Sequence, residues 1–159
     1  MQDGFDFDAF LAGGMGKLIG YCAAIVGPAD AEDVAQEAFV SLWRSLPKLP
    51  NETAASAYLY RAAYHIALDL IRDRRRMQIP EAPVVESDAL SEDMVNALTR
   101  LSPEDRAIVY GRVVDECGYD ELASRFGKSE TWARKRCSLA RKRLAKWLAE
   151  GRKKKEGNT

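Results

Sequence analysis

The chain has 159 residues, of which 47% are apolar and 30% are charged, a composition that is ordinary for a folded protein and excludes wholesale disorder. No stretch approaches the roughly 20 uninterrupted apolar residues of a membrane span, and the acidic start, Met1 to Asp8, lacks the basic residues of a secretory signal. We therefore expect a cytoplasmic protein. Three cysteines without a C-x-x-C pair and a single histidine exclude the usual four-ligand zinc site and argue against a disulfide framework. We expect reduced, buried thiols and no metal.

The formal net charge of zero hides a segregation of charge along the chain. Residues 1–60 carry 3 basic and 8 acidic side chains, whereas residues 61–76 carry 5 basic and 2 acidic ones. Residues 77–127 carry 4 basic and 11 acidic side chains, and residues 128–159 carry 12 and 3. Two acidic blocks thus alternate with two basic ones. This pattern is expected when different parts of one chain must repel and attract a polyanion.

Apolar residues recur at helical spacing through the first half of the chain, and no segment alternates with the period of two that a strand requires. We expect a first helix that ends at Gly27-Pro28. A second helix should begin with Asp30 as its N-cap and end at Pro47, and Thr53 could cap a long third helix. Residues 1–76 are predicted to form the first domain.

Residues 77–90 contain two prolines and three acidic side chains, and are predicted to be a flexible acidic linker. Four shorter helices are expected beyond it. They begin at Ser91, at Ser102-Pro103, at Tyr119 (ending before Gly127) and after Ser129. Residues 91–150 should form the second domain, and residues 151–159 a disordered basic tail. The expected fold is all-α, with two small helical domains joined by a flexible linker.

The last two of these helices, joined by a short turn with a glycine, have the form of a helix-turn-helix. In the last helix, a seam of mostly small apolar residues recurs at i, i+4, i+7 and i+11: Ala133, Cys137, Ala140 and Leu144. The opposite side is basic and fits a DNA major groove, where Arg and Lys read guanine edges or hold phosphates. A merely solvated basic face is the alternative. Trp132 either packs against the turn or touches the DNA backbone.

Four segments carry a family resemblance. Residues 30–44 (DAEDVAQEAFVSLWR) and 58–72 (YLYRAAYHIALDLIR) resemble region 2 of bacterial sigma factors of the sigma-70 family. Residues 101–106 (LSPEDR) and 119–144 (YDELASRFGKSETWARKRCSLARKRL) resemble region 4 of the same family. The two regions occur in the family's order, without the middle domain that larger members have. The resemblance therefore points to the small, extracytoplasmic-function group of sigma factors.

The resemblance implies that the second helix binds core RNA polymerase. Its acidic face would meet the clamp helices of the polymerase beta-prime subunit, and the family's region 4 also contacts the beta flap. If the segment stood alone, a solvated acidic face would be the favoured interpretation. The expected polymerase-binding residues are Asp33, Gln36, Glu37, Phe39 and Trp43.

The third helix would meet the minus-ten element of the promoter. Aromatic rings offer platforms for unstacked bases, and arginines hold phosphates. The expected residues are Tyr58, Tyr60, Arg61, Tyr64, His65, Arg72 and Arg75. An alternative is that Tyr60 and Tyr64 form a core pair against the second helix. The family often has Arg-Asn where this chain has Tyr64-His65, which leaves the base preference open.

The last helix would bind the minus-thirty-five element through its polar face. The expected residues are Ser129, Thr131, Trp132, Arg134, Lys135, Ser138 and Arg141. The family's usual Gly-Thr-Val at the start of this helix is Thr131-Trp132-Ala133 here, which we interpret as a subgroup trait.

The sequence thus predicts a sigma factor that binds core RNA polymerase and directs promoter recognition, DNA melting and transcription initiation. Its expected partners are polymerase, promoter DNA and an anti-sigma factor that a membrane can anchor. We expect no catalytic residue, cofactor or small-molecule substrate, because no nucleophile pattern or phosphate loop occurs. Two alternatives stay open: an adaptor or decoy that binds an anti-sigma factor, and a stand-alone helix-turn-helix repressor.

Overall fold

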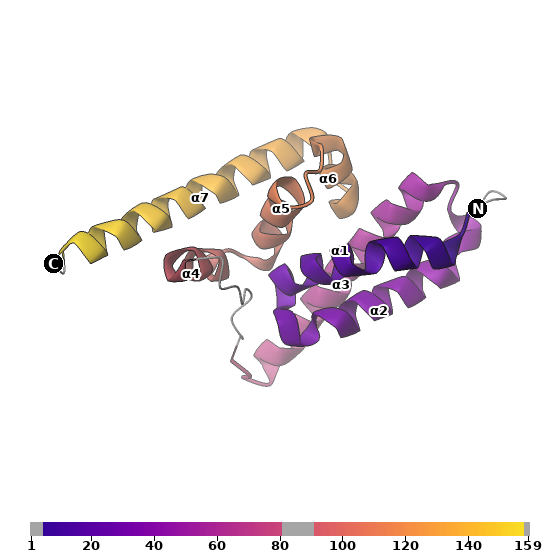
Figure 1. The fold of residues 1–159 in the computed structure, drawn as a ribbon, viewed down its shortest axis with the longest axis horizontal. Helices are drawn as coiled ribbons and strands as arrows, with labels where there is room; N and C mark the ends of the chain where they lie inside the picture. Colours follow the sequence, from indigo (N-terminus) through magenta and orange to yellow (C-terminus); the bar gives the residue numbers. More distant parts are fainter. Residues whose placement is uncertain (1–4, 81–90, 158–159) are drawn as a thin grey trace.

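The computed structural model describes residues 5–80 and 91–157, and every regular element in these ranges is a helix. Figure 1 shows two groups of helices side by side, with the first half of the chain at the right and the second half at the left. The prediction of an all-α fold with a helix-turn-helix in the second half is confirmed.

The first domain contains α1 (Phe7–Val26), α2 (Pro28–Ser45), the short 3-10 helix η1 (Leu46–Lys48) and α3 (Glu52–Arg76). Gly27 joins α1 to α2 at a φ of 92°, a conformation that strongly favours glycine. Pro28 follows as the first residue of α2. The predicted N-cap at Asp30 is therefore wrong, because the helix has already begun two residues earlier. Asp30 instead forms an ion pair with Arg74 of α3.

The long helix α3 begins two residues earlier than the sequence predicted. Asn51, not Thr53, is its N-cap, and the Asn51 side chain accepts a hydrogen bond from the backbone nitrogen of Ala54 at 2.9 Å. At the other end, Gln78 adopts a φ of 57°, and the backbone nitrogen of Ile79 donates to the carbonyl of Arg74. This arrangement closes the last turn of the helix. Most of the predicted linker, residues 81–90, lies outside the described residues.

Helix α1 is apolar enough to span a membrane by length and composition, with a mean hydropathy of 1.6. It is the one such helix among the described residues, although Lys17 and several glycines interrupt its apolar run. Leu18, Tyr21, Cys22 and Ile25 are fully buried against the other helices. These residues lie in the C-terminal half of α1, and 28% of its most apolar window is buried.

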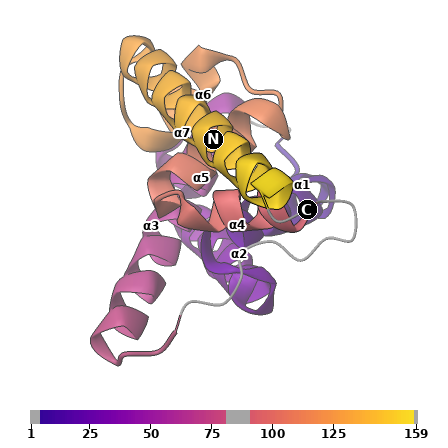
Figure 2. The ribbon, with the colours of Figure 1, turned by 90° about the vertical axis from the view of Figure 1, so that its left-hand side faces the viewer.

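The second domain contains α4 (Glu92–Arg100), α5 (Pro103–Val113), α6 (Tyr119–Phe126) and α7 (Glu130–Gly157). Ser91 and Ser102 are the predicted N-caps, and each side chain accepts a hydrogen bond from the backbone three residues later. Gly127 ends α6 in the left-handed conformation, at a φ of 63°. These local predictions are confirmed. Figure 2 shows α7 lying across α4 and α5, while the C-terminal part of α3 extends away from the other helices.

The prediction of a disordered tail is wrong for residues 151–157, because α7 continues as a helix to Gly157. Lysine and arginine are good helix formers, so the basic run prolongs a helix that has already been nucleated. Contacts with α4 support it: Lys155 pairs with Asp93 at 3.1 Å, and the Arg100 guanidinium stacks on the Trp147 ring. Residues 158–159 lie outside the described residues.

The Asn51 cap predicts that substitutions at Asn51 and Thr53 differ in their effect on stability. Asn51→Ala should lower the free energy of unfolding by about 1 kcal/mol, because the backbone nitrogen of Ala54 loses its acceptor. Thr53→Ala lies inside the first turn and should change stability little. Urea unfolding followed by circular dichroism measures both. Equal effects of the two substitutions would contradict the Asn51 cap.

Candidate polymerase and nucleic-acid interfaces

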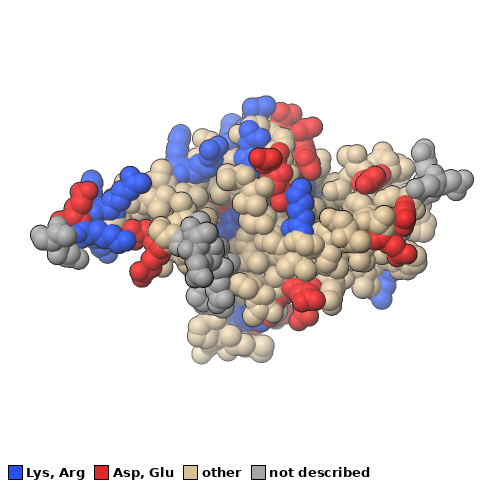
Figure 3. Space-filling view, in the orientation of Figure 1, with Lys and Arg blue, Asp and Glu red and all other residues tan. Residues whose placement is uncertain are grey.

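The face of α7 that was predicted to meet DNA is open to solvent. Ala133, Cys137 and Ala140 form the expected buried seam against the rest of the domain. The opposite side chains are exposed: Thr131, Arg134, Lys135, Ser138 and Arg141. Figure 3 shows Lys and Arg gathered along this helix. The helix thus presents a continuous basic surface on a rigidly packed support.

Arg134 is held in position by its neighbours. Its guanidinium pairs with Glu130 at 2.8 Å and stacks 4.5 Å from the centre of the Tyr119 ring. Arg112 covers the same ring at 4.2 Å, so that Tyr119 lies between two guanidinium groups. The start of α7 is therefore ordered before any ligand binds. Tyr119 and Arg112 were not among the predicted site residues, because their ring and guanidinium meet only in the folded domain.

Two residues at the start of α7 that were predicted to contact DNA, Ser129 and Trp132, contact other parts of the protein. The Ser129 hydroxyl caps the helix and accepts a hydrogen bond from the backbone nitrogen of Trp132 at 3.1 Å. The Trp132 ring packs on Phe126 at 5.6 Å between centroids. Of the two interpretations of Trp132, packing against the turn is the one that the structure supports.

Helix α7 is fixed to α5 by a buried carboxylate. Asp105 is 1% exposed and pairs with Arg136 and Arg143, each at 2.8 Å. It satisfies both its oxygens with cations from the helix that it supports. The side chains of Arg136 and Arg143 remain partly exposed. Their ion pairs with Asp105 therefore also orient the basic face of α7 relative to α5.

The predicted polymerase-binding residues of α2 divide into two sets. Asp33, Gln36 and Glu37 are exposed, and Trp43 is 60% exposed while its ring packs on Phe7 at 4.9 Å. Phe39 is 2% exposed and packs on the same aromatic cluster. Its assignment as a contact residue needs correction: the Phe39 ring supports the surface from within the core and does not face solvent.

The predicted minus-ten residues of α3 also divide into side chains that contact the protein and side chains that are exposed to solvent. The Tyr58 hydroxyl lies against α2, where it hydrogen-bonds Ser41 at 2.8 Å and accepts from Ser45 at 2.9 Å. These bonds lower the pKa of Tyr58 below its usual value. The cationic and imidazole side chains are exposed: Arg61, His65, Arg72 and Arg75.

Tyr60 and Tyr64 are buried in the apolar core of the first domain, as in the core alternative, and their rings also meet the second domain. Tyr60 is 6% exposed and stacks on Tyr21 of α1 at 5.0 Å and under the Arg125 guanidinium at 3.6 Å. Tyr64 is 7% exposed and packs on Phe126 at 5.0 Å. Burial raises the pKa of both phenols above their ordinary range. Both rings therefore face the second domain.

A buried ion pair completes that contact. Arg125 of α6 binds Asp115 at 2.8 Å, and their side chains are 3% and 1% exposed. The two residues come from the second domain, whereas Tyr60 and Tyr21 of the first domain form the wall over the guanidinium. No sequence signal predicts this pair, because its burial depends on how two distant segments meet.

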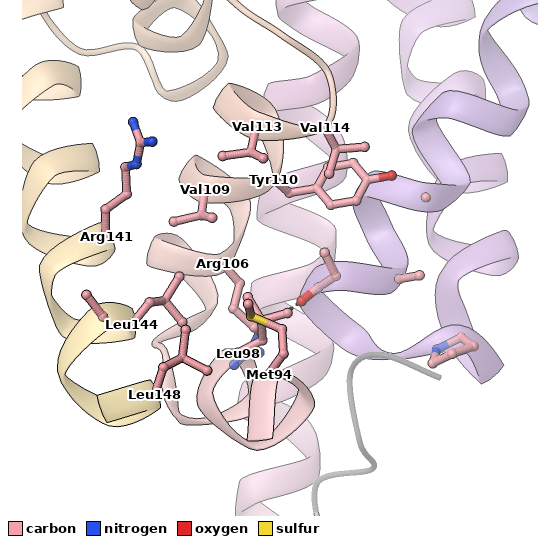
Figure 4. Close-up of a pocket in the computed structure, with 15 residues that line it drawn as sticks. Met94, Leu98, Arg106, Val109, Tyr110, Val113, Val114, Arg141, Leu144 and Leu148 are labelled. Carbon is pink, nitrogen blue, oxygen red and sulfur yellow. Dashed lines mark hydrogen bonds between the residues drawn. The ribbon is translucent and has the colours of Figure 1, made fainter. Parts of the chain in front are cut away.

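An apolar groove of about 560 Å³ lies between α7, α4, α5 and the end of α1. Figure 4 shows Met94, Leu98, Val109, Leu144 and Leu148 pointing into it from three helices of the second domain. Tyr110 and Val114 face its other side, toward α1. The sequence did not predict this groove. Val113 and Val114, which line it, are more than half exposed, as expected of an unfilled apolar face.

No cluster of His, Cys, Asp and Glu within residues 5–80 and 91–157 could hold a metal ion. Cys22, Cys117 and Cys137 are free and buried. Burial raises the pKa of Cys22 to about 12 and that of Cys117 to about 11, so that these thiols are protonated at neutral pH.

The described residues form a three-helix domain with an acidic helix face, followed by a domain with a basic helix-turn-helix, an architecture typical of nucleic-acid-binding proteins. Residues 15–77 match the family described as Sigma-70 region 2, and residues 91–144 match Sigma-70, region 4. Together the two matches include most of the chain. The chain belongs to the sigma-70 family of sigma factors, and extracytoplasmic-function (ECF) members of that family are among its relatives.

Relatives agree with this assignment. The ECF RNA polymerase sigma factor SigM of Mycobacterium tuberculosis is 35% identical over 130 residues, 75% of this chain and 64% of that protein. SigE of Mycolicibacterium smegmatis is 27% identical over 136 residues, 76% of this chain and 52% of that protein. The chain thus spans between half and two thirds of the length of these curated relatives.

Two solved structures have the same fold. The sigma factor RpoE of Bartonella quintana, in complex with the anti-sigma factor NepR, superposes with a TM-score of 0.76 at 21% identity, covering 91% of this chain and 97% of that one. CnrH, in complex with the cytosolic domain of CnrY, has a TM-score of 0.66 at 23% identity, covering 91% and 88%.

The buried ion pair predicts a large mutational effect. Asp115→Ala leaves the Arg125 guanidinium buried without its carboxylate, which should cost about 3–5 kcal/mol of stability. Glu130→Ala breaks the exposed pair with Arg134 and should cost at most about 1 kcal/mol. Urea unfolding of both variants checks this. A small loss for Asp115→Ala would mean that water reaches Arg125.

Proposed function

We propose that this chain is a sigma factor that binds core RNA polymerase and directs promoter recognition, DNA melting and transcription initiation. It carries out no catalytic step of its own and acts in the cytoplasm, at the nucleoid when it is part of the holoenzyme. The observation that carries the proposal is the presence of both sigma-70 regions in one chain, with an exposed acidic face on α2 and an exposed basic face on α7.

The basic face of α7 is proposed to bind the minus-thirty-five element. Arg134 and Lys135 lie near the start of the helix, where a recognition helix contacts base edges. Arg141 and Lys142 lie two turns further on, and are suited to phosphates. Because Arg134 is already oriented by Tyr119, binding DNA costs little side-chain entropy at this position.

Polymerase is proposed to bind at two places. The first is the α2 surface of Asp33, Gln36, Glu37 and Trp43, which combines acidic groups with an exposed aromatic ring. The second is the apolar groove lined by α4, α5 and α7, which we assign to the beta flap. The groove is wide and apolar enough to accept the apolar side of a helix.

An anti-sigma factor is the proposed regulator. RpoE of Bartonella quintana, which shares this fold, was crystallised with the anti-sigma factor NepR, and the structure of CnrH, which also shares it, is in complex with the cytosolic domain of CnrY. By analogy, an anti-sigma protein, soluble or membrane-anchored, would hold this chain inactive. An adaptor that only binds such a partner, or a stand-alone repressor, would not support transcription with core polymerase.

Reversing one charge on α2 tests the proposal. Wild-type chain with core polymerase should initiate at a defined promoter, and Glu37→Lys should abolish both capture of core polymerase and initiation, because an exposed acidic contact becomes repulsive. Circular dichroism should stay unchanged, since Glu37 is exposed. Glu150→Lys, the same charge change at an exposed position of α7, is the matched control. Full capture by Glu37→Lys would refute the α2 assignment.

Replacing one guanidinium on α7 tests the promoter contact. Arg134→Ala in holoenzyme should relax preference within the minus-thirty-five element, at a cost of about 1–3 kcal/mol if Arg134 reads a base edge. Arg152→Ala, in the last turns of the same helix, should leave preference unchanged. Competition between promoter variants at fixed salt measures both. An equal loss for every promoter sequence would make Arg134 a phosphate contact.

A further inference from the structure

Helix α7 continues for about three turns beyond the part of the chain that matches the family. The match to Sigma-70, region 4 ends at residue 144, whereas α7 ends at Gly157. Figure 1 shows these turns running out to the left-hand end of the molecule. Lys155 pairs with Asp93 of α4 at 3.1 Å, and a Cβ at Gly151 would lie 3.3 Å from the Asp93 carboxyl carbon, so that glycine lets the two helices approach closely. The extension is therefore a helix held in a fixed direction by α4.

A line of lysines follows the outer side of α7 from its DNA-facing part into this extension. Residues nine positions apart lie on opposite sides of an α-helix, because nine steps of about 100° amount to two and a half turns. A lysine stands nine positions after each of three residues of the buried seam, Ala133, Cys137 and Leu144. With a fourth lysine near the start of the helix, they form what we call the lysine line: Lys135, Lys142, Lys146 and Lys153. All four are exposed, and the line is about 27 Å long.

The charge of the lysine line is not neutralised by protein. Within residues 5–80 and 91–157, none of its four ammonium groups has a carboxylate partner. Other cations of α7 are paired, as Arg134 is with Glu130. Lys142 and Lys146 are four positions apart, an arrangement in which like charges repel one another on a helix. A polyanion that binds along the line would relieve this repulsion.

The position of the line on α7 fits the wall of a DNA groove. Each of its lysines lies about a quarter turn around the helix from Arg134, which we assign to base edges. A helix is nearly as wide as the major groove, so that its flank faces a phosphate backbone when its front faces the bases. Lysine is suited to this place, because its ammonium group is a point charge that binds phosphate without the forked geometry of arginine. Lys146 and Lys153 lie about 18 and 28 Å along the axis from Arg134, beyond the base-reading turns.

We propose that the lysine line binds the phosphate backbone of duplex DNA beside and beyond the minus-thirty-five element, so that the extension of α7 adds affinity without sequence preference. This inference rests on the proposed function of α7. The two sides of the helix then have separate effects: the front determines which sequence is preferred, and the lysine line strengthens binding to any sequence. Because each neutralised phosphate releases counterions, the contribution of the line is largest at low salt.

Removing single charges from the extension tests the proposal. Lys146→Gln and Lys153→Gln, alone and together, remove the two lysines beyond the family match, and Lys146→Arg keeps the charge. Lys154→Gln is the matched control, because Lys154 is also exposed but lies about 160° around the helix from Arg134. Glutamine is a good helix former, so circular dichroism should not change. Binding of the full chain, free and in holoenzyme, is measured over a series of salt concentrations on a defined promoter duplex and on a scrambled duplex of equal length.

The expected result is a change in salt dependence that is the same for both duplexes. Each glutamine variant of the lysine line should reduce the slope of log affinity against log salt by about 0.9, and the double variant by about 1.8. The ratio of the affinities for the two duplexes should stay as in the wild type. Lys154→Gln and Lys146→Arg should keep the wild-type slope.

Other outcomes would overturn the proposal. An unchanged slope in the double variant would show that the lysines are only solvated, and an equal loss in Lys154→Gln would show an effect of net charge alone. A loss confined to the promoter duplex would make the line a reader of bases. Weaker capture of core polymerase with unchanged DNA binding would assign the line to polymerase. If the holoenzyme initiated at no promoter, the proposed function would fail, while binding of the free chain to the scrambled duplex would still decide the role of the lysine line.

Discussion

The arrangement of the two domains depends on one buried guanidinium, that of Arg106. It is 4% exposed, and it donates to carbonyls at the end of α1 and in the segment that joins α4 to α5. A buried charge is tolerated only where its donors are satisfied, and the carbonyls at the end of a helix are otherwise without partners. The carbonyls therefore satisfy the buried guanidinium, and the guanidinium satisfies carbonyls that would otherwise lack a donor. Ala107, the next residue, joins the apolar core of the first domain, so that the polar anchor and the apolar contact begin at the same turn of α5.

What the sequence predicted correctly is what neighbouring residues determine. Ser102 followed by Pro103 begins α5, and Gly127 ends α6, because each feature satisfies or frees backbone groups within one turn. The buried seam of α7 follows in the same way from helical spacing, and leaves the basic face outside. The failed cap assignments were also local, but there two candidates competed. Pro28 and Asn51 precede Asp30 and Thr53, and the earlier residue began the helix in each case.

The features that escaped prediction depend on residues far apart in the chain. The sequence predicts Arg125 to be an ordinary surface residue of an amphipathic helix. It is buried because Tyr60, more than sixty positions away, covers it. The burial of Tyr60 follows from the same meeting of domains. The end of α7 is a further case, because residues 151–157 look too polar to fold, and contacts with α4 give the helix a partner. Composition alone carries no information about such partners.

The aromatic face of α3 explains why two interpretations of its tyrosines could not be separated from the sequence. A phenol ring offers a π-face that a guanidinium, another aromatic ring or an unstacked base can cover with comparable energy. In this structure Arg125 covers the ring of Tyr60, and Phe126 packs against the ring of Tyr64. The residue types that are suited to an unstacked base are therefore equally suited to the second domain.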